Sequence, residues 1–290
     1  MRRSIRFCGH TLGTPELDLE AAIRLFRELD LDGIEVIVDD GYQCGISHSA
    51  SPGQLRRVAR MSLDAGLVIA GLAPYTYGLN AADEGVRIAA VDQLRRVIGM
   101  AHELSCSGVR ILAGRAAETG RARVGKLLDS LAAVAGEAQS ARVSLNIENH
   151  QGTLADSVGS TLAILEALED PVFGVIFDPA NLILVNDPSA AIGFALQAAY
   201  VRHVHAKDFV FVEGTPRAVP IGTGVVDWTD IAAELDAGGY SGFLSLEYER
   251  RWDLDNLPPA REVMAQSRDH LQNIFDRLDP RSGPGIGEVQ

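Results

Sequence analysis

Four acidic or imidazole side chains stand at the ends of short apolar runs in the 290-residue chain. They are Glu148, Asp178, His205 and Glu247, and each is separated from the next by about the length of one strand and one helix. Three carboxylates held close together repel one another unless a positive group neutralises them. One imidazole cannot do this, whereas a divalent cation can, and three oxygen ligands with one nitrogen suit Mn²⁺, Mg²⁺, Co²⁺ or Zn²⁺ better than a soft metal. Any one of these residues alone is more often a helix cap or a salt-bridge partner, but together they predict one divalent ion, with Mn²⁺ as the first candidate.

The elements that must position these residues alternate along the chain. Short β-branched runs are followed by longer segments in which apolar residues recur at helical spacing. The expected strands are 5–9, 34–37, 67–72, 108–112, 143–148, 174–178, 201–206 and 243–247. The expected helices are 15–29, 52–65, 84–104, 121–140, 157–168, 188–199, 228–237 and 259–278.

This pattern predicts the α/β class and a (β/α)8 TIM barrel, because parallel strands need crossover connections and each helix supplies one. An open doubly wound sheet has the same local pattern, and the number of units decides between the two. We expect residues 1–280 to form a single catalytic domain and residues 281–290 to be a disordered tail. The active site of such a barrel lies at the C-terminal ends of its strands, so the four side chains should converge on one half of the barrel mouth.

Composition narrows the classes of partner. The chain has 26 Lys+Arg against 39 Asp+Glu, a formal net charge of −13, and 47% hydrophobic residues. This apolar content excludes a disordered chain, and the negative field disfavours nucleic acid as a partner. No apolar run reaches the ~18 residues of a spanning helix and no signal peptide is recognisable, so we expect no membrane partner and a cytoplasmic location. Three scattered cysteines without a C-x-x-C pair are typical of free thiols.

Five segments carry a family resemblance: IENH at 147–150, FDPAN at 177–181, HVHAKD at 203–208, PIGTGVVDW at 220–228 and GYSGFLSLE at 239–247. In combination they make the chain similar to the xylose isomerase-like TIM-barrel superfamily, which includes sugar phosphate isomerases and epimerases, inosose dehydratases and hydroxypyruvate isomerases. The resemblance runs from the first strand to about residue 251. It implies metal ligation by Glu148, Asp178, His205 and Glu247, a small sugar or polyol as substrate, and a homo-oligomer, either a dimer or a tetramer.

The resemblance also implies the chemistry of an isomerase or epimerase. The metal would polarise a substrate carbonyl and stabilise an enediolate, while Glu148 and Glu247, facing each other across the substrate, transfer the proton. Further substrate contacts are expected from His150, Lys207, Arg217, Glu35 at the end of the second strand, and Tyr75. Each has a structural alternative: a salt bridge for Lys207 and Glu35, packing for Tyr75, and an ordinary loop position for His150 and Arg217. We expect the loop around Gly222 and Gly224 to be flexible.

Two departures from the epimerase pattern keep a second function open. Asn181 stands where several epimerases of the superfamily carry a histidine that touches substrate. The pair Lys207–Asp208 is more similar to the branch that contains inosose dehydratases and hydroxypyruvate isomerases, so a lyase that removes water from a keto-cyclitol or keto-sugar is the alternative. A non-catalytic sugar-binding barrel is a third. The DNA endonuclease branch of the superfamily is disfavoured, because its zinc cluster needs histidines that this chain lacks.

Overall fold

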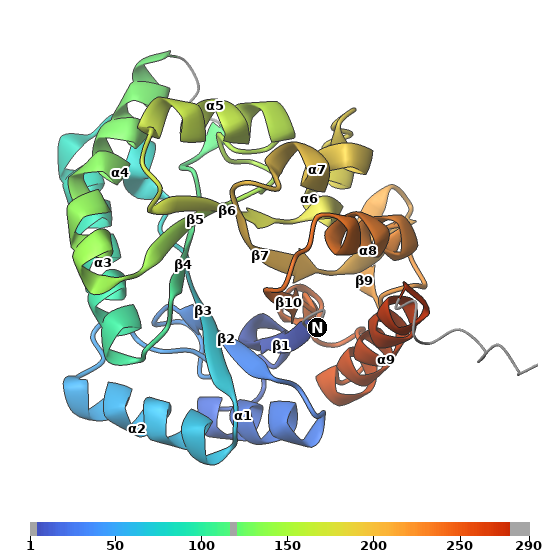
Figure 1. The fold of residues 1–290 in the computed structure, drawn as a ribbon. Coiled ribbons are helices and arrows are strands. Elements are labelled where there is room, and N and C mark those ends of the chain that lie inside the picture. The colour runs from blue at the N-terminus through green and yellow to red at the C-terminus, as the bar shows by residue number, and fades with distance from the viewer. Residues whose placement is uncertain (1–4, 117–120, 279–290) are drawn as a thin grey trace, which may run out of the picture.

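The computed structural model describes residues 5–116 and 121–278. Eight parallel strands close into a barrel in the order β1-β10-β7-β6-β5-β4-β3-β2, and helices surround it (Figure 1). The barrel strands are β1 (Arg6–His10), β2 (Gly33–Val38), β3 (Val68–Pro74), β4 (Gly108–Ile111), β5 (Ser144–Glu148), β6 (Phe173–Phe177), β7 (Val201–Ala206) and β10 (Phe243–Leu246). All eight expected strands are therefore present, and the predicted (β/α)8 TIM barrel is confirmed.

The helices lie outside the barrel. They are α1 (Leu19–Glu28), α2 (Pro52–Asp64), α3 (Glu84–Glu103), α4 (Arg121–Ala141), α5 (Val158–Leu168), α6 (Pro179–Leu184), α7 (Gly193–Gln197), α8 (Trp228–Ala237) and α9 (Ala260–Leu278). Among the described helices, none combines the length and the apolar character that crossing a bilayer would require. The expected tail at 281–290 lies outside the described residues.

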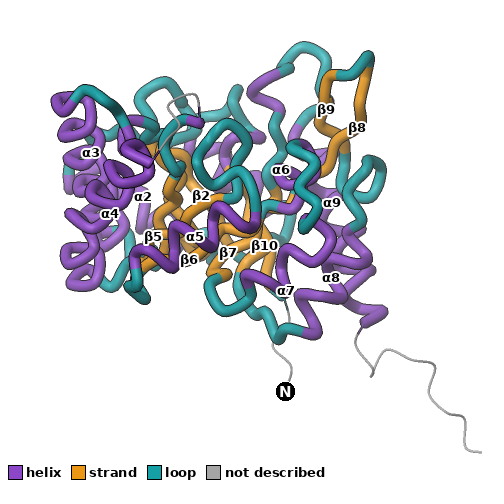
Figure 2. Tube along the Cα trace, turned by 90° about the horizontal axis from the view of Figure 1, so that it is seen from above, coloured by secondary structure: helices purple, strands orange, loops and turns teal. Residues whose placement is uncertain are grey.

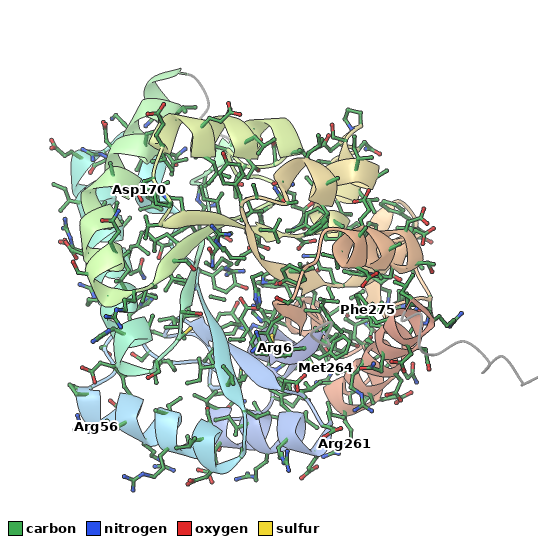
Figure 3. The ribbon with its side chains drawn as sticks, viewed as in Figure 1. Arg6, Arg56, Asp170, Arg261, Met264 and Phe275 are labelled. Carbon is green, nitrogen blue, oxygen red and sulfur yellow. The ribbon has the colours of Figure 1, made fainter. Side chains whose placement is uncertain are left out.

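Strand alternation separates an apolar layer from a polar barrel interior. On β1, Phe7 belongs to the apolar core and Gly9 faces α1 so closely that a Cβ there would meet the ring of Phe26 at 2.6 Å. Met264 of α9 packs into the same layer, and side chains fill the space inside the ring of strands (Figure 3). The opposite face of β1 presents Cys8 and His10, both fully buried. The barrel interior is therefore where polar groups accumulate.

Two segments differ from expectation. After β6 the chain forms the short helices α6 and α7, with a 3₁₀ turn at Ala190–Ile192, in place of one helix over 188–199. Asp178 caps α6 directly, accepting a hydrogen bond from the backbone N–H of Asn181 at 3.0 Å, so the helix begins as soon as the strand ends. The sequence pattern also missed an antiparallel hairpin, β8 (Asp208–Val212) and β9 (Thr215–Val219), which stands beyond the barrel at the end opposite the N-terminus (Figure 2).

The loop after this hairpin was expected to be flexible, and the structure shows why that was wrong. Asp208 accepts four backbone N–H hydrogen bonds: its Oδ2 from Gly222 at 3.0 Å and Gly224 at 2.9 Å, and its Oδ1 from Phe209 at 2.9 Å and Val226 at 3.1 Å. Gly224 permits the close approach, because a Cβ there would lie 2.1 Å from Asp208 Oδ1. One buried carboxylate therefore fixes the loop to the start of the hairpin.

Candidate functional site

The structure brings the four predicted metal-binding residues together. Glu148 ends β5, Asp178 follows β6, His205 lies in β7 and Glu247 follows β10. These four strands are consecutive neighbours in the barrel, which explains why residues so far apart in the sequence converge. All four side chains are buried, and one candidate ligand atom from each lies within 4.8 Å of the others.

The imidazole of His205 is held from both sides. Its Nδ1 lies 3.2 Å from Glu148 Oε1 and 3.4 Å from Glu247 Oε2. Its Nε2 lies 3.1 Å from Glu35 Oε2. Burial alone would lower the pKa of His205, but Glu35, Glu247 and Glu148 raise it well above its usual value. With both nitrogens protonated, Nε2–H donates to Glu35 and Nδ1–H donates to Glu148.

Glu35 does not lie at a strand end as expected, because β2 continues to Val38. Its carboxylate is 1% exposed and also accepts a hydrogen bond from His203 Nε2 at 2.9 Å. Burial would raise the pKa of Glu35, but His205 and His203 hold it well below its usual value. Glu35 thus occupies the edge of His205 remote from Glu148 and Glu247, which is the position of a carboxylate that orients a ligand histidine.

Arg110 was not anticipated. It lies in β4, is 2% exposed, and donates from Nη1 to Glu148 Oε2 at 3.2 Å and from Nη2 to the carbonyl oxygen of Pro74 at 3.3 Å. Burial would raise the pKa of Glu148, but Arg110, with His150 and His205, lowers it to about 2. A charged residue inside an otherwise apolar strand was the signal that the sequence offered. The guanidinium keeps Glu148 ionised and fixes one of its oxygens.

Asp178 serves two purposes with its two oxygens. Oδ1 caps α6, while Oδ2 accepts from Asn181 Nδ2 at 2.8 Å and lies 2.9 Å from Lys207 Nζ. Burial, with the nearby charges of Glu247 and Glu148, raises the pKa of Asp178 to about 6 against the opposing effect of Lys207. Asn181 Nδ2 also donates to the carbonyl oxygen of Asn149 at 3.0 Å. Its amide therefore holds the carboxylate cluster in place.

The ammonium group of Lys207 lies inside the same cluster. It is 2.9 Å from Asp178, 3.0 Å from Glu247 and 2.9 Å from Glu249, whose side chain is partly exposed. Burial would lower the pKa of Lys207, but these carboxylates raise it well above its usual value. The salt bridge to Asp178 that was expected as its structural alternative is present. All three N–H donors of the ammonium face carboxylates.

The buried charges of this cluster do not balance. Four carboxylates (Glu35, Glu148, Asp178 and Glu247) meet two cations (Arg110 and Lys207). With the imidazoles neutral, as a ligand imidazole must be, two negative charges remain. A divalent ion supplies that charge, and a donor set of three carboxylates and one imidazole is one that such ions accept. The residues present therefore fit a divalent metal.

His10 adds an unpartnered donor to this site. Its Nδ1 accepts from the backbone N–H of Leu12 at 3.1 Å, which places the proton of the neutral ring on Nε2. Burial lowers the pKa of His10 to about 4, so the ring stays neutral. Nε2 is buried without a hydrogen-bond partner among the described residues and lies 3.9 Å from Glu247 Oε1. A buried donor of this kind calls for a partner that the protein itself does not provide.

Of the remaining residues predicted to contact substrate, two lie beside the cluster. Tyr75 lies at the edge of the cluster, with the Arg110 guanidinium 4.6 Å from its ring centre, and it stacks on Tyr42 and Tyr77. His150 follows Glu148 in the loop after β5, and its ring Nδ1 lies 2.6 Å from the carbonyl oxygen of Gln151. Both border the candidate metal centre.

Arg217 is not brought into the cluster. It lies in β9, exposed, and donates to the carbonyl oxygen of Asn256 at 2.9 Å. Its Nε is 3.8 Å from Asp253. The hairpin, which the sequence pattern did not predict, carries Arg217 to a separate pocket beside the site.

Comparisons with known proteins agree with this architecture. Residues 23–274 match the model of the xylose isomerase-like TIM barrel family. The chain is 23% identical over 281 residues to fructoselysine 3-epimerase of Shigella flexneri, covering 92% of this chain and 97% of that protein. Among solved structures, an L-ribulose 3-epimerase superposes with a TM-score of 0.78 at 19% identity, covering 97% of this chain and 99% of the other. A probable 3-DHS dehydratase from Bacillus anthracis superposes with a TM-score of 0.75 at 17% identity, covering 93% and 99%.

The family match spans most of the chain and includes all four strands that deliver Glu148, Asp178, His205 and Glu247. The closed barrel, the five sequence segments and this match agree. The chain belongs to the xylose isomerase-like TIM barrel family.

Proposed function

We propose that the protein is a divalent-metal-dependent sugar epimerase or isomerase, with Glu148, Asp178, His205 and Glu247 as the metal ligands. The observation that carries this proposal is the buried cluster of these four side chains. Counted together with Glu35, Arg110 and Lys207, and with a neutral imidazole, it has a surplus of two negative charges, which matches one divalent ion. Mn²⁺ is the first candidate. The epimerase activity of relatives that cover nearly the whole chain supports the same class of reaction.

The ion, when bound, would polarise a substrate carbonyl and so acidify the neighbouring C–H bond. Glu148 and Glu247 flank the same imidazole nitrogen from different strands, so a sugar carbon held between them would face a carboxylate on either side. We assign to one glutamate the removal of the proton, which it keeps, while the other, which must have taken up a proton from solvent before that step, delivers its own proton to the opposite face. Such a transfer between faces inverts the carbon, which is an epimerisation.

The two glutamates are not equivalent. Arg110 binds Glu148 Oε2, while Glu247 Oε1 accepts no hydrogen bond from the described residues and has only His10 Nε2 nearby, at 3.9 Å. Glu247 Oε1 is therefore the oxygen that we assign to first proton removal. The unpartnered N–H of His10 beside it would donate to a substrate oxygen and hold the reacting carbon in place.

Lys207 contributes positive charge where negative charge develops on the substrate. Its three donors are occupied by carboxylates, so a substrate oxygen must replace one of them. Glu249 is the partly exposed member of the three and is the one that we expect to be exchanged. His150 and Tyr75, at the rim, are assigned to substrate contact.

A dehydratase remains the second candidate, and Lys207 is the observation that favours it. An ammonium among the carboxylates could protonate a leaving hydroxyl after the same C–H cleavage, so that water is lost where an epimerase would return the proton. Either reaction begins at the same carbon, which is why the cluster alone does not separate them.

The experiment is proton exchange by NMR in deuterated water. Mn²⁺-loaded protein is incubated with L-ribulose, D-tagatose, fructoselysine and a keto-cyclitol. We expect deuterium at one carbon and a new epimer in at least one sample; an unsaturated product would identify the dehydratase. Glu148→Gln and Glu247→Gln should abolish exchange, while Glu166→Gln, an exposed position on α5, should not. Absence of exchange in every sample, or full activity in either cluster variant, would refute the proposal.

A further inference from the structure

A second cavity lies beside the candidate metal centre. It has a volume of about 530 Å³ and is bounded on one side by the hairpin, including Thr215 and Arg217, and on the other by residues 249–257. This volume falls within the range of ligand pockets, roughly 300–1,000 Å³. None of the four proposed metal ligands lines it, so its occupant is distinct from the reacting carbonyl.

An ion pair links the wall of the cavity to the candidate metal centre. Glu249 lines the cavity and contacts Lys207 Nζ at 2.9 Å. The same ammonium contacts Asp178 at 2.9 Å and Glu247 at 3.0 Å. One molecule could therefore place one end among the metal ligands and its other end in the cavity, passing Glu249.

The lining of the cavity combines an aromatic ring with planar polar groups. Trp252 is 61% exposed, although so large an aromatic side chain is ordinarily covered. Arg217, Asp253 and Asn256 also line the cavity. The Asn256 amide donates to Asp253 Oδ1 at 2.7 Å, and the Arg217 guanidinium donates to the carbonyl oxygen of Asn256 at 2.9 Å. The apolar C–H face of a pyranose stacks on an indole ring, while its equatorial hydroxyls donate to carboxylates and amides and accept from guanidinium groups.

The charges of the cavity argue against other occupants. A phosphate group would meet the carboxylates of Glu249 and Asp253 in the same wall. A bare ammonium group would meet Arg217. Arg217 and Asp253 compensate each other at 3.8 Å, and Glu249 is compensated by Lys207. The balance favours a neutral molecule that is rich in hydroxyl groups.

We propose that this cavity binds a second sugar ring, stacked on Trp252, so that the protein binds a keto-sugar linked to another sugar in preference to a free ketose or a sugar phosphate. This inference rests on the proposed function only for the position of the first ring. Binding to the cavity is independent of turnover and is measured without it.

The test compares binding of ketoses with and without a second ring. Calorimetric titrations of Mn²⁺-loaded protein use the disaccharides lactulose, maltulose and isomaltulose, which differ in linkage, against D-fructose and fructose 6-phosphate. We expect at least one disaccharide to bind about tenfold more tightly than D-fructose, as stacking plus apolar burial of one ring would give. Trp252→Ala should remove this advantage and Trp252→Phe should keep most of it.

Phe211→Ala is the matched control. Phe211 is an exposed aromatic residue of β8, in the hairpin that borders the cavity, but Phe211 itself does not line the cavity. The variant should leave the preference unchanged. The inference is overturned if no disaccharide binds more tightly than D-fructose, if fructose 6-phosphate binds most tightly, or if Trp252→Ala keeps the preference. If free ketoses undergo proton exchange but no disaccharide binds more tightly than D-fructose, only the proposal of a second sugar ring in the cavity is refuted. A disaccharide preference without any exchange would refute the proposed function alone.

Discussion

Glu35→Gln tests whether a residue that we do not assign as a ligand controls the metal site. Glu35 accepts from His205 Nε2 at 3.1 Å and from His203 Nε2 at 2.9 Å. The charge of the carboxylate favours a proton on Nε2 of His205, so that Nδ1, the nitrogen beside Glu148 and Glu247, is the one that gives up its proton when a metal binds. Glutamine removes that charge and offers one acceptor oxygen for two N–H donors.

The expected loss follows from these contacts. A hydrogen bond to a charged group contributes ~1.5–3 kcal/mol, and removing a carboxylate behind a ligand histidine typically costs about 10–100-fold in metal affinity. We therefore expect the Mn²⁺ dissociation constant of Glu35→Gln to rise about 10–100-fold in calorimetric titrations. Circular dichroism and urea unfolding of the metal-free variant would show that the barrel is intact.

Two control variants distinguish a loss of His205 orientation from a general disturbance of the protein. His203→Gln removes the other partner of Glu35 and should weaken Mn²⁺ binding much less, because His203 meets the cluster only through an edge contact of its ring with His205 and is not one of the four proposed ligands. Glu166→Gln makes the same chemical change on the surface and should have no effect. If Glu35→Gln binds Mn²⁺ as tightly as the unchanged protein, the reasoning that assigns Glu35 to the orientation of His205 is wrong.

Three further predictions concern the same cluster. Mn²⁺ binding at pH 7 should release about one proton, because the raised pKa of His205 makes it an imidazolium whose proton the metal displaces. The affinity for Mn²⁺ should fall below about pH 6, where Asp178, with its pKa of about 6, becomes protonated. Calorimetric titrations in buffers of different ionisation enthalpy, repeated at several pH values, measure both effects. Arg110→Met should destabilise the metal-free protein by about 3–5 kcal/mol in urea unfolding, because it leaves Glu148 buried without its cation, and an unchanged midpoint would contradict this. Asp208→Ala should increase hydrogen exchange at Gly222, Gly224 and Val226 and cost at least about 2 kcal/mol, whereas equal protection in both proteins would show that the clamp is unimportant.

Much of the barrel could be predicted because each strand is a short apolar run and each helix has an apolar stripe. The four strand-end residues could be predicted for the same reason: parallel strands in a closed barrel end on one side, so position along the strand determines position at the mouth. The hairpin could not be predicted, because its strands change from buried at the base to exposed at the tip without an alternating pattern, and residues 215–219 contain Pro216 and Arg217.

The residues that contact the four proposed ligands could not be predicted from the spacing of residues in the sequence. Glu35 was expected at the end of the second strand, but it is the third residue of β2, which runs to Val38, and its side chain lies buried inside the barrel. Arg110 meets Glu148 across neighbouring strands, and that contact depends on register, which periodicity does not determine. The helix expected over 188–199 is reduced to a 3₁₀ turn and the short α7, while Asp178 and Pro179 start the separate helix α6 directly after β6.

Lys207 and Asp208 are adjacent in the chain yet serve opposite sides of it. Lys207 turns inward to the carboxylates, while Asp208 closes the neck of the hairpin by binding the amides of Gly222 and Gly224. The base of the hairpin is thus fixed by the hydrogen bonds of Asp208. We therefore expect that changes in the length or sequence of its tip leave the ammonium group of Lys207 in place. Replacing residues 209–219 by those of a homologue should accordingly change the selectivity for the part of the substrate that lies away from the metal ligands, and should leave the residues of the reacting centre unchanged.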